Sequence, residues 1–242
     1  MAKTILVTSG KGGTGKSTTS AFLGQALASR GKNVLLVELD GGLRSLDVAL
    51  GVAKNVVLDF GDVARGTPLM DAVMPCSFCP GLYVLCASGS VLPVLTETLV
   101  KIMTEAQGRF DYILWDCPAG IGDTLRASAK ISSLALVIAT PDSSSVRAAQ
   151  SAGRILLSEG VKARRLVIER CPDQPKKLRP IRDLDEIIDQ TEIQLLGVIW
   201  EDPATRIAFN TGAPLPESSP NRKTFADLAS RVLGERVPLG FH

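Results

Sequence analysis

The chain has 242 residues, of which 45% are hydrophobic and 21% are charged, enough apolar side chains for one sizeable core. Its net charge is +2 and its lysines and arginines are scattered, so composition gives no case for nucleic acid or an acidic membrane as partner. Five cysteines, an odd number in a chain this long, favour free thiols in a cytoplasmic protein. The N-terminus leads directly into an apolar strand without a signal, and no apolar run has the length of a membrane span.

The first predicted elements flank a glycine-rich loop. Residues 4–9 read as a buried strand and residues 18–29 as a helix. The loop between them satisfies the pattern G-x-x-x-x-G-K-[ST] at Gly10, Gly15, Lys16 and Ser17. In such a loop, backbone N–H groups close around phosphate oxygens, the lysine reaches the outer phosphates and the hydroxyl is offered to magnesium. We therefore predict a nucleotide site here.

Strands and helices alternate along the rest of the chain. Apolar, β-branched runs predict strands at residues 33–39, 82–87, 110–115, 133–139, 166–169 and 194–199. Helical patterns occur at residues 56–64, 69–73, 95–107, 144–158, 181–190, 204–211 and 221–233, and residues 172–180 are expected to form a loop. The alternation predicts an α/β fold with a mostly parallel twisted sheet and helices on both faces. Together with the phosphate-binding loop at Gly10, Gly15, Lys16 and Ser17, it predicts a P-loop NTPase fold. We expect a single domain over residues 1–242, in which 235–242 form a short tail.

Acidic residues stand where predicted strands end, and ligands of an open parallel sheet bind beyond those ends. Asp116 follows an apolar strand and is the natural partner of magnesium, through water, unless it caps a helix or forms a salt bridge. Asp40 could orient or deprotonate an attacking water. Glu38 shares a strand face with Asp40, and it either tunes the charge of the site or is simply solvated.

Phosphoryl transfer requires cations around the outer phosphate, a metal and a held water. The chain supplies that set at Lys11, Lys16, Ser17, Asp40 and Asp116. Serine-histidine hydrolysis is poorly supported, because the one histidine is His242 at the end of the sequence. Cys76 and Cys79 have the spacing of a metal half-site, which is incomplete unless two chains contribute one pair each.

These motifs resemble the deviant Walker A ATPases of the MinD/ParA group. The group's loop K-G-G-T-G-K-S-T is present at residues 11–18, and later segments resemble switch I, switch II and two further motifs of its MinD members, at residues 38–51, 116–121, 141–147 and 197–202. The similarity covers almost the whole chain. It implies ATP or ADP and Mg²⁺ as ligands. The residues that it assigns to the nucleotide are Gly10, Lys11, Gly12, Gly13, Thr14, Gly15, Lys16, Ser17, Thr18, Gly120 and Arg170.

The resemblance also implies roles for individual residues. Lys11 is the signature lysine that crosses to the nucleotide of the opposite subunit in a dimer that holds ATP between two chains. In a monomer it would repel Lys16, whereas shared triphosphates carry enough negative charge to accept both ammonium groups. Asp40 is assigned to water activation, Asp116 to magnesium through water, and Gly120 to sensing the γ-phosphate through its backbone. Hydrolysis would then relax the switch loops, so ATP controls dimerisation.

The chain departs from the group's pattern around the base. Residues 170–172 read Arg-Cys-Pro instead of arginine-tyrosine-asparagine, so only Arg170 matches the residues that hold adenine. Trp200 stands where MinD members have proline, and it either stacks on the base or, the reading we favour, packs in the core. Glu38 replaces an aspartate. Pro238 and Gly240 prevent residues 235–242 from forming the group's amphipathic membrane helix, so peripheral membrane association is expected only if a tail is missing from this sequence.

The resemblance implies a MinD-like ATPase switch that forms a homodimer with ATP and takes part in septum placement, with a protein activator and a division-inhibitor partner. One alternative is a ParA-like DNA-segregation ATPase with ATP-dependent, non-specific DNA binding. A second is a scaffold-type metal or iron–sulfur carrier that uses Cys76 and Cys79, and a weaker third is a small-molecule kinase. The modest charge and the MinD-type switch I favour the first function. The sequence does not identify the activator or the cargo.

Overall fold

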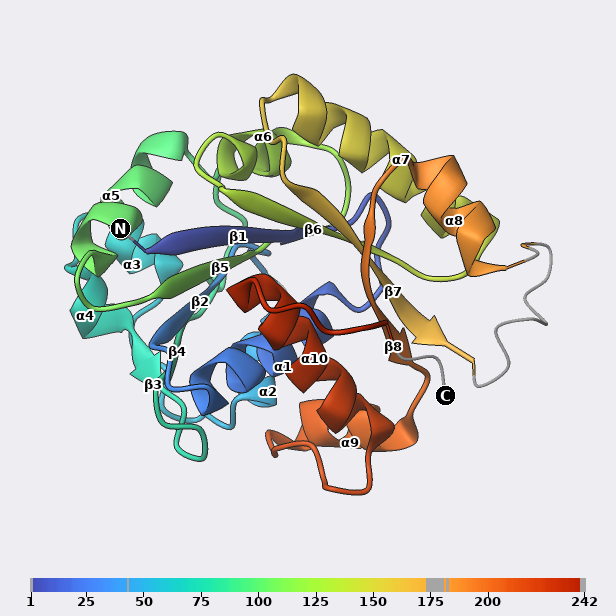
Figure 1. The fold of residues 1–242 in the computed structure, drawn as a ribbon. Coiled ribbons are helices and arrows are strands. Elements are labelled where there is room, and N and C mark those ends of the chain that lie inside the picture. The colour runs from blue at the N-terminus through green and yellow to red at the C-terminus, as the bar shows by residue number, and fades with distance from the viewer. Residues whose placement is uncertain (1, 43, 173–180, 182, 240–242) are drawn as a thin grey trace.

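A computed structural model describes residues 2–42, 44–172, 181 and 183–239. Its centre is a twisted sheet of eight strands in the order β3-β4-β2-β5-β1-β6-β7-β8 (Figure 1). The strands are β1 (Lys3–Thr8), β2 (Val34–Glu38), β3 (Met74–Pro75), β4 (Leu82–Leu85), β5 (Tyr112–Asp116), β6 (Leu134–Ala139), β7 (Arg164–Cys171) and β8 (Leu195–Trp200). All neighbouring strands pair in parallel except β3, which is antiparallel to β4. The predicted fold class is therefore confirmed.

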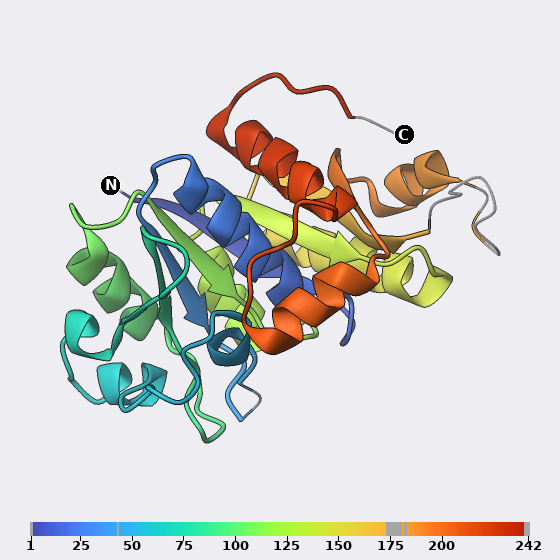
Figure 2. The same ribbon diagram turned by 90° about the horizontal axis from the view of Figure 1, so that it is seen from below.

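Helices cover both faces of the sheet. One face carries α1 (Lys16–Ser29), α2 (Leu46–Ala49), α9 (Pro203–Thr211) and α10 (Pro220–Leu233), and Figure 2 shows α1 and α10 side by side there. The other face carries α3 (Phe60–Ala64), α4 (Leu69–Ala72), α5 (Thr96–Ala106), α6 (Asp123–Ala129), α7 (Ser143–Ser158) and α8 (Leu184–Thr191). Because strand side chains alternate, Ile5 and Val7 pack toward α1 whereas Leu6 packs on the opposite face. Among the described residues no helix is both long and apolar enough to traverse a bilayer.

The predicted elements are present, with differences at short helices and at element ends. The sequence pattern predicted neither β3 nor the short helices α2 and α6. The helix expected over 56–64 begins only at Phe60, because Asp59 caps it in a reciprocal capping box with Asp62. The helix expected over 181–190 begins after Asp183, which caps it in turn. Most of the loop expected at 172–180, and His242, lie outside the described residues.

The sheet topology places the loop after β1 at a switch point. β1 lies between β5 and β6, so the chain leaves its carboxyl end with a neighbouring strand end on each side. Ligands of open parallel sheets bind at such crevices. The glycine-rich loop, the segment after β5 and the segment after β6 therefore meet at one edge of the molecule.

Candidate functional site

The loop between β1 and α1 has the backbone of a phosphate cradle. Gly13 and Gly15 have φ of 72° and 97°, which side chains of L-residues rarely adopt. Gly10 approaches α7 so closely that a Cβ would lie 2.2 Å from the carbonyl oxygen of Ala148. No side chain caps the start of α1, so the free N–H groups of its first turn are available to an anion.

The two residues predicted to hold magnesium meet at the first turn of α1. The Ser17 hydroxyl donates to Asp116 Oδ2 at 2.6 Å, and the Ser20 hydroxyl donates to Oδ1 at 2.8 Å. Burial raises the pKa of Asp116 to about 7, although both hydroxyl groups act to lower it. Lys16 is buried beside them, with 8% of its surface exposed. Hydroxyl and carboxylate oxygens suit Mg²⁺, which keeps several of its waters, so the donor set fits this ion.

Lys11 is bound within its own chain. Its ammonium lies 3.1 Å from Asp142 Oδ1 and donates to Ser144 Oγ at 2.7 Å. Asp142 caps α7 by accepting from the Ser145 N–H at 3.0 Å, and it also accepts from the Thr140 hydroxyl at 2.6 Å. Burial acts to raise the pKa of Asp142, but these hydrogen bonds and Lys11 lower it well below its usual range. The signature lysine is therefore held at the start of α7.

Glu38 is fully buried at the end of β2, so the interpretation of a solvated side chain is wrong. Its Oε1 accepts from the Ser45 N–H at 2.7 Å and from the Leu46 N–H at 3.1 Å, and Oε2 accepts from the Ala87 N–H at 3.2 Å. Burial raises the pKa of Glu38, and the backbone hydrogen bonds oppose that shift. The carboxyl group thus joins the switch I segment, the start of α2 and the loop after β4.

Asp40 and Gly120 lie on loops beside the phosphate cradle. Asp40 is half-buried just beyond β2, and its charge adds to the effects of burial and Asp116 that raise the pKa of Cys117 to about 12. The N–H of the preceding residue, Leu39, donates to the Asp116 carbonyl at 2.9 Å, so the loop that carries Asp40 begins next to the segment after β5. In that segment, Gly120 has φ of 106° and its N–H donates to the Ser9 carbonyl at 3.0 Å. A contact between this N–H and a phosphate would have to replace that hydrogen bond.

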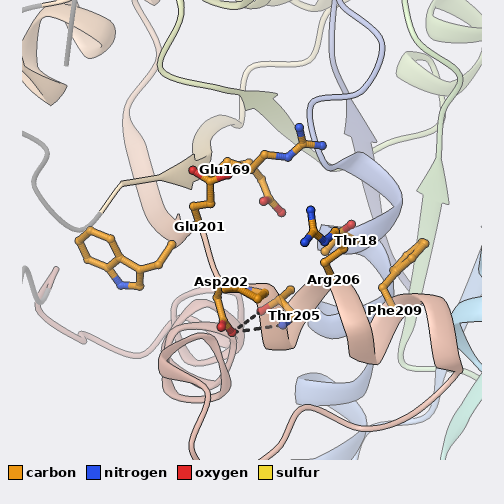
Figure 3. Close-up of a pocket in the computed structure, with 10 residues that line it drawn as sticks. Thr18, Glu169, Glu201, Asp202, Thr205, Arg206 and Phe209 are labelled. Atoms are coloured by element: carbon orange, nitrogen blue, oxygen red, sulfur yellow. Dashed lines mark hydrogen bonds between the residues drawn. The ribbon is translucent and has the colours of Figure 1, made fainter.

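A pocket of about 290 Å³ opens beside the first turn of α1 (Figure 3). Its lining comes from α1, the ends of β7 and β8, and α9. The lining residues are Thr18, Glu169, Arg170, Trp200, Glu201, Asp202, Pro203, Thr205, Arg206 and Phe209. Arg170 is exposed and has φ of 55°, a conformation that is uncommon outside glycine. Trp200 is half-buried, packs against the hydrophobic core and also lines the pocket, so packing and a contact with a base are compatible.

Cys76 and Cys79 do not complete a metal site within the part of the chain that the structure describes. Cys76 donates to the Leu50 carbonyl at 3.7 Å and Cys79 donates to the Gln25 carbonyl at 3.9 Å. Burial, with a contribution from Cys76, raises the pKa of Cys79 to about 11, which disfavours a thiolate ligand. No group of three or more histidine, cysteine, aspartate or glutamate side chains there is placed to hold an ion.

Three polar residues of the site were missed in the sequence. Ser20 supports Asp116, Asp142 holds Lys11, and Glu169 lies fully buried behind the first turn of α1. Glu169 could have been predicted as a site residue, because it is an acidic residue at the end of a predicted strand, as Asp116 is. Asp142 precedes three serines at a helix start, which is a capping pattern, but its partner could not be deduced from the sequence.

Comparisons with known proteins identify relatives of this chain in sequence and in fold. A family model described as ParA, NUBPL iron-transfer P-loop NTPase, matches residues 1–233. The septum site-determining protein MinD of Bacillus subtilis (strain 168) is 38% identical over 246 residues, covering 99% of this chain and 92% of that protein. A structure titled MinC:MinD cell division protein complex, from Aquifex aeolicus, has a TM-score of 0.91 and 33% identity, covering 99% of this chain and 98% of that one.

A second solved structure contains a nucleotide. MinD from Pyrococcus horikoshii OT3, complexed with Mg-ADP, has a TM-score of 0.79 and 28% identity, covering 96% of each chain. The family match, the 38% identity over almost the entire length and the shared fold all lead to one assignment. The chain belongs to the MinD/ParA family of P-loop NTPases.

Proposed function

We propose that this chain is a MinD-like ATPase switch that binds ATP with Mg²⁺, dimerises around it, hydrolyses it and takes part in placing the division septum. The observation that carries the proposal is the 2.6 Å contact between Ser17 and Asp116 at the uncapped start of α1. It brings the predicted metal ligands together where a bound triphosphate would end. The similarity to MinD proteins over 99% of the chain supports the same function.

Each part of the site has a role in this proposal. The N–H groups of the loop and the Lys16 ammonium would hold the phosphates, and Ser17 and, through water, Asp116 would hold Mg²⁺. When bound, Mg²⁺ neutralises charge that develops on the phosphate oxygens. Asp40 orients the attacking water and accepts its proton. Lys11 leaves Asp142 to reach the nucleotide of the partner subunit.

The pocket lined by Trp200 and Phe209 would receive the base and ribose. It adjoins Thr18, which follows the metal ligand Ser17 directly in the chain, so a nucleotide with its phosphates in the loop extends toward it. The two aromatic side chains offer apolar surface for a base, and Arg170 also lines the pocket. Figure 3 shows Arg206 and Phe209 at the same pocket. Thr18 and Arg170 were assigned to the nucleotide from the sequence, and contact with the base was one of the two interpretations given for Trp200, whereas Arg206 and Phe209 were not predicted.

The partners follow from the same relatives. Because the Aquifex MinD-like chain was solved as a MinC:MinD complex, we propose a division-inhibitor protein as one partner and a second copy of this chain as another. DNA is a weaker candidate, since the net charge is only +2. The metal-carrier function is disfavoured because burial raises the pKa of Cys79. A small-molecule acceptor, as in a kinase, has no observation in its favour.

Light scattering with a non-hydrolysable ATP analogue and Mg²⁺ tests the proposal. We expect the wild type to change from monomer to dimer, Lys11→Ala to bind the analogue but stay monomeric, and Lys16→Ala to lose binding. A wild-type monomer at saturating analogue would contradict the proposal. Salt-sensitive retention on DNA that requires ATP would favour the segregation alternative instead.

A further inference from the structure

The end of β7 is irregular at the point where it reaches the pocket. Its pairing with β8 shifts register between Ile168 and Cys171, and Arg170 adopts positive φ there. Such a bulge redirects the side chains next to it. Glu169, 3% exposed, lies on the side of the sheet that α1 covers, and Figure 3 shows it at the pocket.

The Glu169 carboxyl group contacts both ends of the first turn of α1. Its Oε1 accepts from the Thr19 hydroxyl at 2.9 Å. On the other side it lies so close to Gly15 that a Cβ there would be 2.6 Å from the carboxyl carbon. Gly15 is the cap residue of α1 and directly precedes Lys16. One buried side chain therefore contacts Gly15 and Thr19, which lie on either side of the predicted phosphate ligand Lys16 and metal ligand Ser17.

Filling space does not account for an acid at this position. An apolar side chain of similar volume would pack without the cost of burying a carboxyl group. What only a polar group supplies is an acceptor for Thr19, because a buried hydroxyl without a partner is itself costly. The hydrogen bond from Thr19 thus couples the carboxyl group to the first turn of α1, so that a shift of either one displaces the other.

We propose that Glu169 is a positioning residue of the phosphate site, which fixes Gly15 and the first turn of α1 so that their N–H groups and Lys16 face the nucleotide. The inference rests on the proposed function, since it concerns how that nucleotide is held. It assigns no contact between Glu169 and the reacting atoms.

The charge state of Glu169 makes the proposal testable. Burial raises the pKa of Glu169 to about 8, although the Thr19 hydrogen bond and the Arg170 charge act to lower it. The other charged groups around the pocket are Glu201 and Asp202 after β8 and Arg206 on α9, and Lys16 follows Gly15 on α1. A bound triphosphate adds negative charge, which favours the neutral acid further. Asp116, which contacts the same turn through Ser17 and Ser20, has a pKa of about 7 and is already ionised above pH 8. Above pH 8 binding must therefore take up a proton at Glu169, and affinity should fall as pH rises from 8 to 9.

The experiment measures affinity for a non-hydrolysable ATP analogue with Mg²⁺ by calorimetric titration between pH 6.5 and pH 9. Glu169→Gln keeps the volume and an acceptor for Thr19 without a titrating proton, so we expect affinity within about twofold of wild type at pH 7 and a flatter pH profile. Glu169→Ala leaves the Thr19 hydroxyl unpaired, and we expect affinity to fall on the order of tenfold. Exposed Glu97→Gln on α5 is the matched control and should follow the wild-type profile.

Two results would overturn the inference: Glu169→Gln that follows the wild-type pH profile, or Glu169→Ala with wild-type affinity. If Glu169→Ala fails to fold, as judged by its thermal unfolding, the glutamine variant alone decides the matter. Wild-type protein that binds no ATP analogue at any pH would instead contradict the proposed function, so the two failures are distinguishable.

Discussion

The proposed dimer gives Lys11 two positions, one in the isolated chain and one at the nucleotide of a partner. In the isolated chain its ammonium is paired with Asp142 and Ser144, and both members of the ion pair have 45% of their side-chain surface exposed. Exposed ion pairs contribute only about 0–1 kcal/mol. The pair can thus hold Lys11 in a defined place without preventing its transfer to a partner's nucleotide, which offers far more negative charge.

Weakening this pair should favour the dimer. Asp142→Asn keeps the acceptor that caps α7 but removes the charge that holds Lys11, so we expect half-maximal dimerisation with the ATP analogue at about two- to fivefold lower protein concentration. Light scattering over a concentration series measures the shift, and thermal unfolding checks that the cap is retained. An unchanged or higher midpoint would show that the contact does not restrain Lys11.

At the scale of elements, Glu38 connects the nucleotide site with the surface loops. Its carboxyl group joins the end of β2 to the start of α2 and to the loop after β4. Arg44 strengthens the same junction, since it donates to the Ala87 carbonyl at 2.8 Å and to Asp59 at 2.6 Å. Asp40 follows Glu38 by two residues, so this junction lies directly beside the loop that carries Asp40.

Removing this junction should cost stability. Glu38→Ala leaves the buried N–H groups of Leu46 and Ala87 without acceptors, so we expect the free energy of unfolding to fall by about 3 kcal/mol. Urea denaturation measures the change. Exposed Glu97→Ala serves as the control and should stay within about 0.5 kcal/mol of wild type. A loss of that small size for Glu38→Ala would mean that water or other groups replace the carboxyl oxygens.

At the scale of the whole molecule, the site concentrates buried carboxyl groups behind the phosphate loop. Burial raises the pKa of Asp116 to about 7 and that of Glu169 to about 8. Both groups keep their protons in the folded state at pH values where the unfolded chain has lost them. Their contribution to stability is therefore present at low pH and is lost as pH rises from about 4, the ordinary carboxyl pKa, through 7 and 8.

The nucleotide-free protein should consequently be less stable at pH 8 than at pH 5.5. For each of the two groups the free energy of unfolding should fall by at most about 1.4 kcal/mol per pH unit. Urea denaturation across this range, in buffers without magnesium, measures the slope, and Glu169→Gln should reduce it. A stability that stays level or rises over the same range would contradict the assignment of protonated buried acids.

Features that depend on the local sequence pattern could be predicted from the sequence alone. The strand at residues 4–9, the loop and α1 follow from hydrophobic periodicity and glycine spacing, and Asp116 follows from its place after a strand. The short helix α2 was not predictable, because Glu38 fixes its start from a different element. Lys11 and Asp142 are 131 residues apart, and the direction of Glu169 depends on a bulge at Arg170. These features arise from tertiary pairing, which periodicity does not encode.

The central claim is that two chains share each nucleotide site, with Lys11 supplied by the partner. The direct test mixes two inactive variants, Lys11→Ala and Asp40→Ala, and measures ATP hydrolysis. In a mixed dimer, one site retains its own Asp40 and receives Lys11 from the other chain. Because one of the two sites in a mixed dimer is intact, each mixed dimer should hydrolyse ATP at about half the rate of a wild-type dimer. A mixture that forms dimers but stays as inactive as its components would contradict the account.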